Sequence, residues 1–117
     1  MKHYHAHIYF QFANQETQNL IDKAFALHSQ IFIVYKIHSK KVGPHFLPMI
    51  ELHFMESNKA EVMAWLNMNR KDFSVLIHED TGDDIKDHLS PIWLGEELPI
   101  DFIFFEKVKR DASLSVH

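Results

Sequence analysis

The spacing of hydrophobic residues along this chain changes in a definite order, and that order restricts the fold more strongly than any other feature. Residues 3–12 alternate apolar and polar positions, which is the period of a β-strand with one buried face. Residues 15–28 then place apolar side chains at helical spacing behind Asn14, a good helix N-cap. Residues 31–38 are rich in β-branched and aromatic types, which favour a strand. This part of the chain therefore predicts a strand, a helix and a second strand.

The same pattern repeats further along the chain. Alternation returns at residues 46–55, although Pro48 donates no ladder hydrogen bond and predicts a gap or bulge early in this strand. A helix is expected at about 58–70, where Glu61 stands in capping-box spacing, and a fourth strand at 73–78. The order strand, helix, strand, strand, helix, strand predicts an α+β, ferredoxin-like two-layer sandwich (βαββαβ), with both helices on one face of an antiparallel sheet.

Three segments follow the predicted sandwich. Residues 78–88 read as a polar loop, and residues 90–99 as a turn-rich segment. Residues 100–106, IDFIFFE, predict a C-terminal extension strand or edge whose aromatic side chains serve packing or a subunit contact. The tail from about residue 107 is expected to fray. A length of 117 residues indicates one domain, spanning 1–117.

Composition and charge exclude several classes of function. Hydrophobic residues make up 46% of the chain and charged residues 24%, as in an ordinary globular domain. The net charge of -4, with scattered Lys and Arg, provides no surface for a phosphate backbone. No apolar run approaches the roughly 20 residues of a membrane-spanning helix, and no apolar signal core follows the first lysine. We therefore expect a cytoplasmic protein that binds neither nucleic acid nor a membrane.

Histidine is the residue that carries the functional signal. The chain has 10 His and 0 Cys, so any metal site must use nitrogen and oxygen ligands. Such ligands suit Fe(II), Zn, Mn, Ni or Cu, and a mixed set of His and carboxylate with open positions is typical of non-haem iron. Five histidines lie where predicted strands or loops begin or end: His5, His7, His45, His78 and His88. Solvated or structural roles are expected for the others: His3, His28, His38, His53 and His117.

The predicted topology brings four of these histidines together. We expect the 3–12 strand to lie between the 46–55 strand, parallel to it, and the 73–78 strand, antiparallel to it. The start of the first strand, the start of the third and the end of the fourth then share one rim. Alternation also places His5, His7 and His78 on the face opposite the helices. An isolated HxH pair is more often a packing or surface feature, and only this convergence favours a metal site.

Several motifs support a family resemblance. They are HAHIYF at 5–10, VGPH at 42–45, the stretch from AWLNMNR through SVLIH to TGDDIKDH at 64–88, and WLG at 93–95 followed by a leucine and an aspartate. In this order, over roughly residues 5–105, they resemble the DOPA 4,5-dioxygenase family. The resemblance implies a ferredoxin-like fold and Fe(II)-dependent extradiol cleavage of a catechol ring. Phe46 and Glu79 stand where the family usually has proline, and Glu79 adds a negative charge beside His78.

The resemblance also implies roles for particular side chains. A subset of His5, His7, His45 and His78 would hold the metal, expected to be Fe(II), with zinc as an alternative in the purified protein. A nearby base must take a phenolic proton and return it, and we assign this task to His88, oriented by Asp87 or Asp84, with His78 as the alternative. The residues expected to contact a DOPA-like substrate are Tyr9, Trp93 and Leu76 as apolar walls, Asp87, and Glu51, which could instead be a carboxylate ligand.

The sheet face away from the helices needs a cover, because its apolar side chains would otherwise form a sizeable exposed patch. Either the C-terminal segment or a second subunit can cover it, so we expect a homodimer. Three function classes follow. They are an extradiol dioxygenase acting on a small aromatic substrate and O2, a zinc- or aromatic-binding protein without oxygenase activity, and a structural dimer module.

Overall fold

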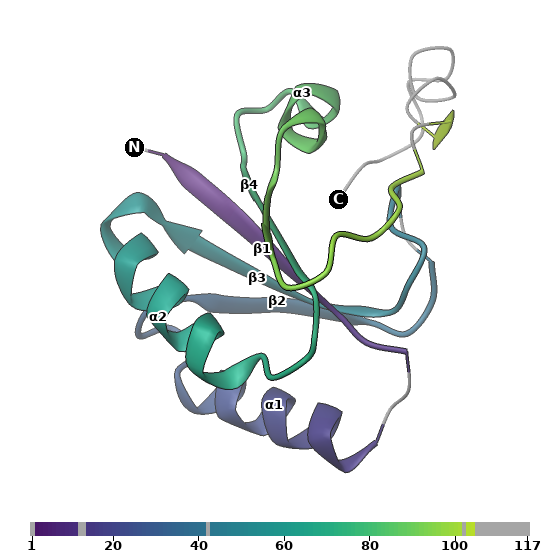
Figure 1. The fold of residues 1–117 in the computed structure, drawn as a ribbon. Helices are drawn as coiled ribbons and strands as arrows, with labels where there is room; N and C mark the ends of the chain where they lie inside the picture. Colours follow the sequence, from purple (N-terminus) through teal and green to yellow (C-terminus); the bar gives the residue numbers. More distant parts are fainter. Residues whose placement is uncertain (1, 12–13, 42, 102, 105–117) are drawn as a thin grey trace.

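The computed structural model of the chain describes residues 2–11, 14–41, 43–101 and 103–104 (Figure 1). Its elements are β1 (His3–Tyr9), α1 (Gln15–Ala26), β2 (Ile33–His38), β3 (Met49–Met55), the 3-10 turn η1 (Glu56–Asn58), α2 (Lys59–Asn69), β4 (Val75–Glu79), α3 (Asp84–Leu89) and β5 (Ile92–Leu94). The five strands form one sheet in the order β2-β3-β1-β4-β5, and every neighbouring pair is antiparallel. The predicted α+β class is confirmed.

Helices α1 and α2 cover one face of the sheet (Figure 1). Helix α1 begins where predicted, because the Asn14 side chain accepts a hydrogen bond from the Thr17 backbone N–H at 3.0 Å. The two helices bury Leu20, Ala24, Val62 and Leu66 against apolar residues of the three central strands: Ala6, Ile8, Ile50, Leu52, Val75 and Ile77. Full burial of one large apolar side chain is worth about 1.5–3 kcal/mol. This layer is the main hydrophobic core.

The opposite face of the sheet, which we call the distal face, has a smaller apolar cluster made of Tyr9, Met49 and Leu76. Trp93 of β5 and Leu98 pack against it, together with Leu47 and Ile100. Part of the distal face is therefore covered by the chain that follows β4. The C-terminal segment is one of the two possible covers that the sequence predicts for this face.

The direction of β3 relative to β1 differs from the prediction. The two strands are antiparallel, so Tyr9 at the end of β1 lies opposite Met49 at the start of β3. The reason is that β3 runs back from β2 as its antiparallel neighbour and is inserted between β2 and β1. The predicted coincidence of strand starts is therefore wrong. His45 still approaches β1, but from the segment before β3, which is bridged to Ile100.

The region after β4 also differs from the prediction. Residues 84–89 form helix α3 instead of a polar loop, and the Asp83 side chain caps it by accepting from the Lys86 backbone N–H at 3.1 Å. The added strand is β5, formed by Ile92–Leu94. Of the predicted strand at 100–106, Ile100 makes an isolated antiparallel bridge to His45. Residues 103 and 104 are helical, and the Phe104 N–H donates to the Asp101 carbonyl oxygen at 3.2 Å. Residues 102, 105 and 106 lie outside the described structure. The predicted tail from 107 also lies outside it.

Helix α2 begins without the predicted capping box. The 3-10 turn η1 leads into it, and the Asn58 side chain makes no capping hydrogen bond. None of the helices in the described part of the chain is long and apolar enough to cross a membrane.

Candidate functional site

The strand register aligns polar side chains from three neighbouring strands on the distal face. His5 of β1 lies opposite His53 of β3 on one side and opposite His78 of β4 on the other. His7, two residues along β1, lies opposite Glu51. Because alternate residues of a strand share a face, these side chains all project away from α1 and α2. The centre of the distal face is therefore polar, whereas the centre of the helix-covered face is apolar.

Two further histidines approach this polar patch from outside the three strands, His45 from the segment before β3 and His88 from α3. Ring centroids lie 4.3 Å apart for His7 and His45, 4.3 Å apart for His78 and His88, and 5.0 Å apart for His5 and His78. His7, His45 and His88 are fully buried, and His78 is nearly so. The structure brings together all four histidines predicted as ligands and also His88, and we call these five residues the histidine cluster.

The chain beside His78 orients its ring. Nδ1 of His78 lies 3.1 Å from the Glu79 carbonyl oxygen, which only accepts, so Nδ1 carries the hydrogen and Nε2 of the neutral ring has a lone pair. That nitrogen faces Nε2 of His7 at 3.0 Å. Nδ1 of His7 in turn lies 3.1 Å from the Met49 sulfur. A ring that donates from one nitrogen to a carbonyl and turns the other toward a cluster is typical of metal-binding histidines.

Tyr9 fixes the position of His45. Its hydroxyl oxygen lies 2.6 Å from Nδ1 of His45, and the ring is only 4% exposed. Burial raises the pKa of Tyr9 above its ordinary value, so the phenol keeps its proton. When Nδ1–H of His45 donates to the Tyr9 oxygen, Nε2 of His45 is the nitrogen with a lone pair for an ion. Tyr9 therefore acts through His45 and is not simply an apolar wall.

Burial also keeps the rings of His5, His7 and His78 neutral. It lowers the pKa of His5 to about 4, assisted by nearby His53, and the pKa of His78 to about 3, assisted by His88. The pKa of His7 lies well below its ordinary value, first because of burial and then because of His45. Neutral imidazoles offer lone pairs, which is the form that a divalent ion binds.

Two overlapping sets of three histidines have ligand atoms within 4.8 Å of one another. One set is His5, His7 and His78, and the other is His7, His45 and His88. Bonds from zinc to imidazole are about 2.0–2.1 Å, so ligands on opposite sides of one ion are separated by about 4 Å. Small side-chain movements are enough to close either set around an ion. His7 belongs to both sets, so any ion held by either one depends on it.

Glu51 is buried between two imidazoles. It is 1% exposed, and its two carboxylate oxygens lie 3.1 Å from Nε2 of His38 and 2.6 Å from Nε2 of His53. These imidazoles contact both oxygens of the carboxylate that we expected to meet a substrate or a metal. His38 and His53, for which the sequence suggests only solvated or structural roles, thus belong to the polar network of the distal face. Glu51 and His53 stand two residues apart on one strand, and the antiparallel register with β1 is the signal that places them beside His5.

Asp87 contacts the loop that precedes α3. Its two oxygens accept hydrogen bonds from the hydroxyl and the backbone N–H of Thr81, at 2.6 Å and 2.9 Å. Asp87 therefore closes the loop before α3. The side chain of Asp84, the other residue expected to orient His88, lies outside the described structure.

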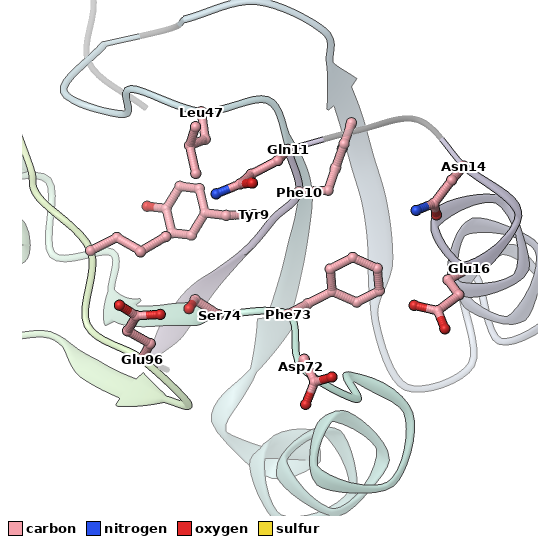
Figure 2. Close-up of a pocket in the computed structure, with 11 residues that line it drawn as sticks. Tyr9, Phe10, Gln11, Asn14, Glu16, Leu47, Asp72, Phe73, Ser74 and Glu96 are labelled. Carbon is pink, nitrogen blue, oxygen red and sulfur yellow. The ribbon is translucent and has the colours of Figure 1, made fainter.

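Two cavities differ in their relation to the histidine cluster. One of about 230 Å³ lies at the end of β1, where Tyr9, Leu47, Ser74 and Glu96 line it (Figure 2). None of its described lining residues is a histidine. The other, of about 500 Å³, has both His88 and Trp93 in its wall. The larger cavity is the better candidate for a substrate, because it adjoins the cluster.

Comparison with known proteins points to one family. The profile of the Dopa 4,5-dioxygenase family matches residues 4–104. The DOPA 4,5-dioxygenase of Amanita muscaria is 28% identical over 110 residues, which are 86% of this chain and 48% of that protein. An uncharacterized 21.2 kDa protein of Botryotinia fuckeliana is 29% identical over 89 residues, 68% of this chain and 49% of that one. This chain thus spans about half the length of the curated relatives it matches.

A solved structure gives a similar result over nearly the whole chain. The crystal structure of a protein from Nostoc punctiforme, provisionally assigned as a dioxygenase, superposes with a TM-score of 0.75 at 27% sequence identity. The match covers 92% of this chain and 94% of that one. All five histidines of the cluster fall within the residues that match the family profile.

Proposed function

This chain belongs to the Dopa 4,5-dioxygenase family, and from that premise we propose that it is a metal-dependent dioxygenase that opens a catechol ring with O2 in an extradiol reaction. The observation that supports the proposal is the meeting of five histidines from β1, the segment before β3, β4 and α3 in one largely buried cluster. Burying polar rings costs free energy unless they are hydrogen-bonded or bind a ligand. A bound metal would offset the cost of burying these five rings. Metal-dependent oxygen chemistry also agrees with the family to which the chain belongs.

The donor atoms fit Fe(II). They are imidazole nitrogens, and His78 turns the lone pair of Nε2 toward His7. Nδ1 of His5 is buried and has no hydrogen-bond partner in the described part of the chain, so it can accept an ion. Bound Fe(II) would supply the redox chemistry that lets O2 react with an aromatic ring.

We assign the metal to His7 and two partners, and the set of partners decides which residue moves the proton. In the preferred arrangement His5, His7 and His78 hold the ion, and His88 takes a phenolic proton from the substrate and returns it. His88 suits this task because it lines the larger cavity and so can meet a substrate hydroxyl. In the alternative arrangement His45 and His88 join His7 as ligands, and His78 moves the proton.

The larger cavity is the proposed substrate site. Its volume of about 500 Å³ is in the range of small-molecule sites, and Trp93, Leu98 and Ile100 give it apolar walls for an aromatic ring. Glu97 lies in the same wall, so this carboxylate, and not Glu51, is placed to accept the amine of a DOPA-like substrate. Tyr9 supports the site through His45.

We also propose a ferredoxin-like fold and a homodimer. The order β2-β3-β1-β4, with α1 and α2 on one face, supports a ferredoxin-like frame to which β5 is an addition. Ile33 and Tyr35 of β2 are each 53% exposed, and a second copy of the chain would cover them. Light scattering after gel filtration should therefore give the mass of a homodimer, and the mass of one chain would reject that part.

Oxygen uptake tests the activity directly. Protein loaded with Fe(II) under argon should consume O2 and form a yellow ring-opened product when mixed with DOPA or another catechol. His7→Ala should abolish both signals, whereas His3→Ala, an exposed residue on the same strand and face, should leave them intact. Stable zinc and tight aromatic binding without turnover would favour the non-catalytic binding protein instead.

A further inference from the structure

A buried carboxylate lies beside the histidine cluster but belongs to neither of its two sets. Glu51 of β3 is 1% exposed, and the side chain of its neighbour on the same face, His53, is 28% exposed. Nε2 of His53 lies 2.6 Å from Oε2 of Glu51. An ionised carboxylate in such a place requires a cationic or hydrogen-bonding partner, or a metal ion.

His5 completes a set of three around this carboxylate. It lies directly opposite His53 in the register of β1 and β3. One nitrogen of His5, one of His53 and one oxygen of Glu51 lie within 4.8 Å of one another. Hydrogen bonds from imidazoles can satisfy the carboxylate, but they leave Nδ1 of His5 buried without a hydrogen-bond partner in the described part of the chain.

We propose that His5, Glu51 and His53 form a second metal site that takes a divalent transition ion such as Zn²⁺ or Co²⁺. While this site is filled, His5 is not available to the proposed catalytic ion, which then takes the alternative set of His7, His45 and His88. Two imidazoles and one carboxylate select ions of this class, whereas Ca²⁺ and Mg²⁺ prefer ligand sets made of oxygen. An ion in this site leaves His7, His45 and His88 as an intact set for the other ion. The chain can therefore hold two ions without sharing a residue.

The stacking of the rings shows what must move when the second site fills. The His5 and His53 rings are parallel to within 7°, with centroids 3.8 Å apart, so their lone pairs lie in two separate parallel planes and one ion cannot lie in both. An ion requires one ring to tilt. His53 is the ring with room to do so, because it is partly exposed and its other neighbour is the exposed ring of Tyr35, stacked at 4.3 Å.

Metal content per chain tests the second site independently of activity. Metal-free protein is saturated with Zn²⁺ or Co²⁺, passed through gel filtration and analysed by mass spectrometry for the metal. The wild type should retain two ions per chain, and Glu51→Gln and His53→Asn should each retain one. His3→Asn is the matched control and should retain two. His7→Ala should retain one, because it disables only the other site.

Three results would overturn the second site: a single ion in the wild type that His7→Ala loses, two ions in His53→Asn, or loss of both ions from Glu51→Gln and His53→Asn together. If circular dichroism shows that Glu51→Gln does not fold, His53→Asn decides alone, because its side chain is partly exposed. One ion in both the wild type and His7→Ala, with none in His53→Asn, would instead contradict only the proposed catalytic site.

Discussion

The two faces of the sheet are built from the same three central strands, and both are buried. Burial has a different effect on each face. On the face against α1 and α2, Ala6 and Ile8 of β1 lie among aliphatic side chains, and each buried group stabilises the fold. On the distal face, His5 and His7 of the same strand lie among other imidazoles and a carboxylate. Burial there lowers pKa values and holds lone pairs at fixed positions. Alternate residues of β1 thus stabilise the fold on one face and form the candidate site on the other.

The largest expected difference between the faces is in stability. Ile8→Ala should lower the free energy of unfolding by about 2–5 kcal/mol, because Ile8 is fully buried in the main core. The double change His7→Leu and His78→Leu should leave metal-free protein about as stable as the wild type or more stable, because both partners of a buried polar contact are replaced together. Urea denaturation measures both values. A double variant that loses as much stability as Ile8→Ala would show that the two faces do not differ in this way.

The pH dependence of stability should come from the distal face. Unfolded histidine has a pKa of about 6.5, whereas folded His5 and His78 have pKa values of about 4 and about 3. Between these values the unfolded chain binds more protons, so metal-free protein should lose stability as the pH falls below about 6.5, by up to about 1.4 kcal/mol per pH unit for each histidine. Denaturation at pH 7, 6, 5 and 4 measures the slope. Replacing His5 and His78 by Asn should flatten it, and Ile8→Ala should not.

Within the distal face, His88→Ala tests whether His88 is a metal ligand or the residue that moves the proton. In the preferred arrangement the variant keeps its metal and opens the ring about 10²-fold more slowly, the usual weight of general acid and base assistance. Metal content and single-turnover rates measure both effects. Loss of the metal would place His88 among the ligands, in the arrangement with His7 and His45, and a wild-type rate would remove His88 from the reaction.

The smallest expected effect is that of a residue acting through another. Tyr9→Phe removes the hydroxyl 2.6 Å from Nδ1 of His45 but keeps the ring that packs on Trp93. If His45 is a ligand, metal affinity should fall about 10- to 100-fold, as is typical when the partner of a metal-binding histidine is removed. Metal competition with a chelator measures this change. An unchanged affinity would place His45 outside the ligand set.

Local patterns in the sequence were enough to predict the α+β class and the face on which the histidines lie. Alternation alone assigned Ala6 and Ile8 to one face and His5 and His7 to the other, because the side-chain period of a strand is two. The direction of β3 relative to β1 depends on contacts far apart in the sequence, and the predicted parallel direction was wrong. For that reason the pairing of His5 with His53 and of His7 with Glu51 was not predicted. Helix α3 was missed because it has only 6 residues, too few for a periodic signal.

Anomalous X-ray diffraction from crystals of the Fe(II)-loaded protein would test the central claim most directly. The strongest anomalous peak should lie about 2 Å from a nitrogen of His7 and from nitrogens of two further members of the histidine cluster. A peak bonded to other residues, or a histidine cluster without any peak in fully loaded protein, would contradict the claim that this cluster holds the catalytic metal.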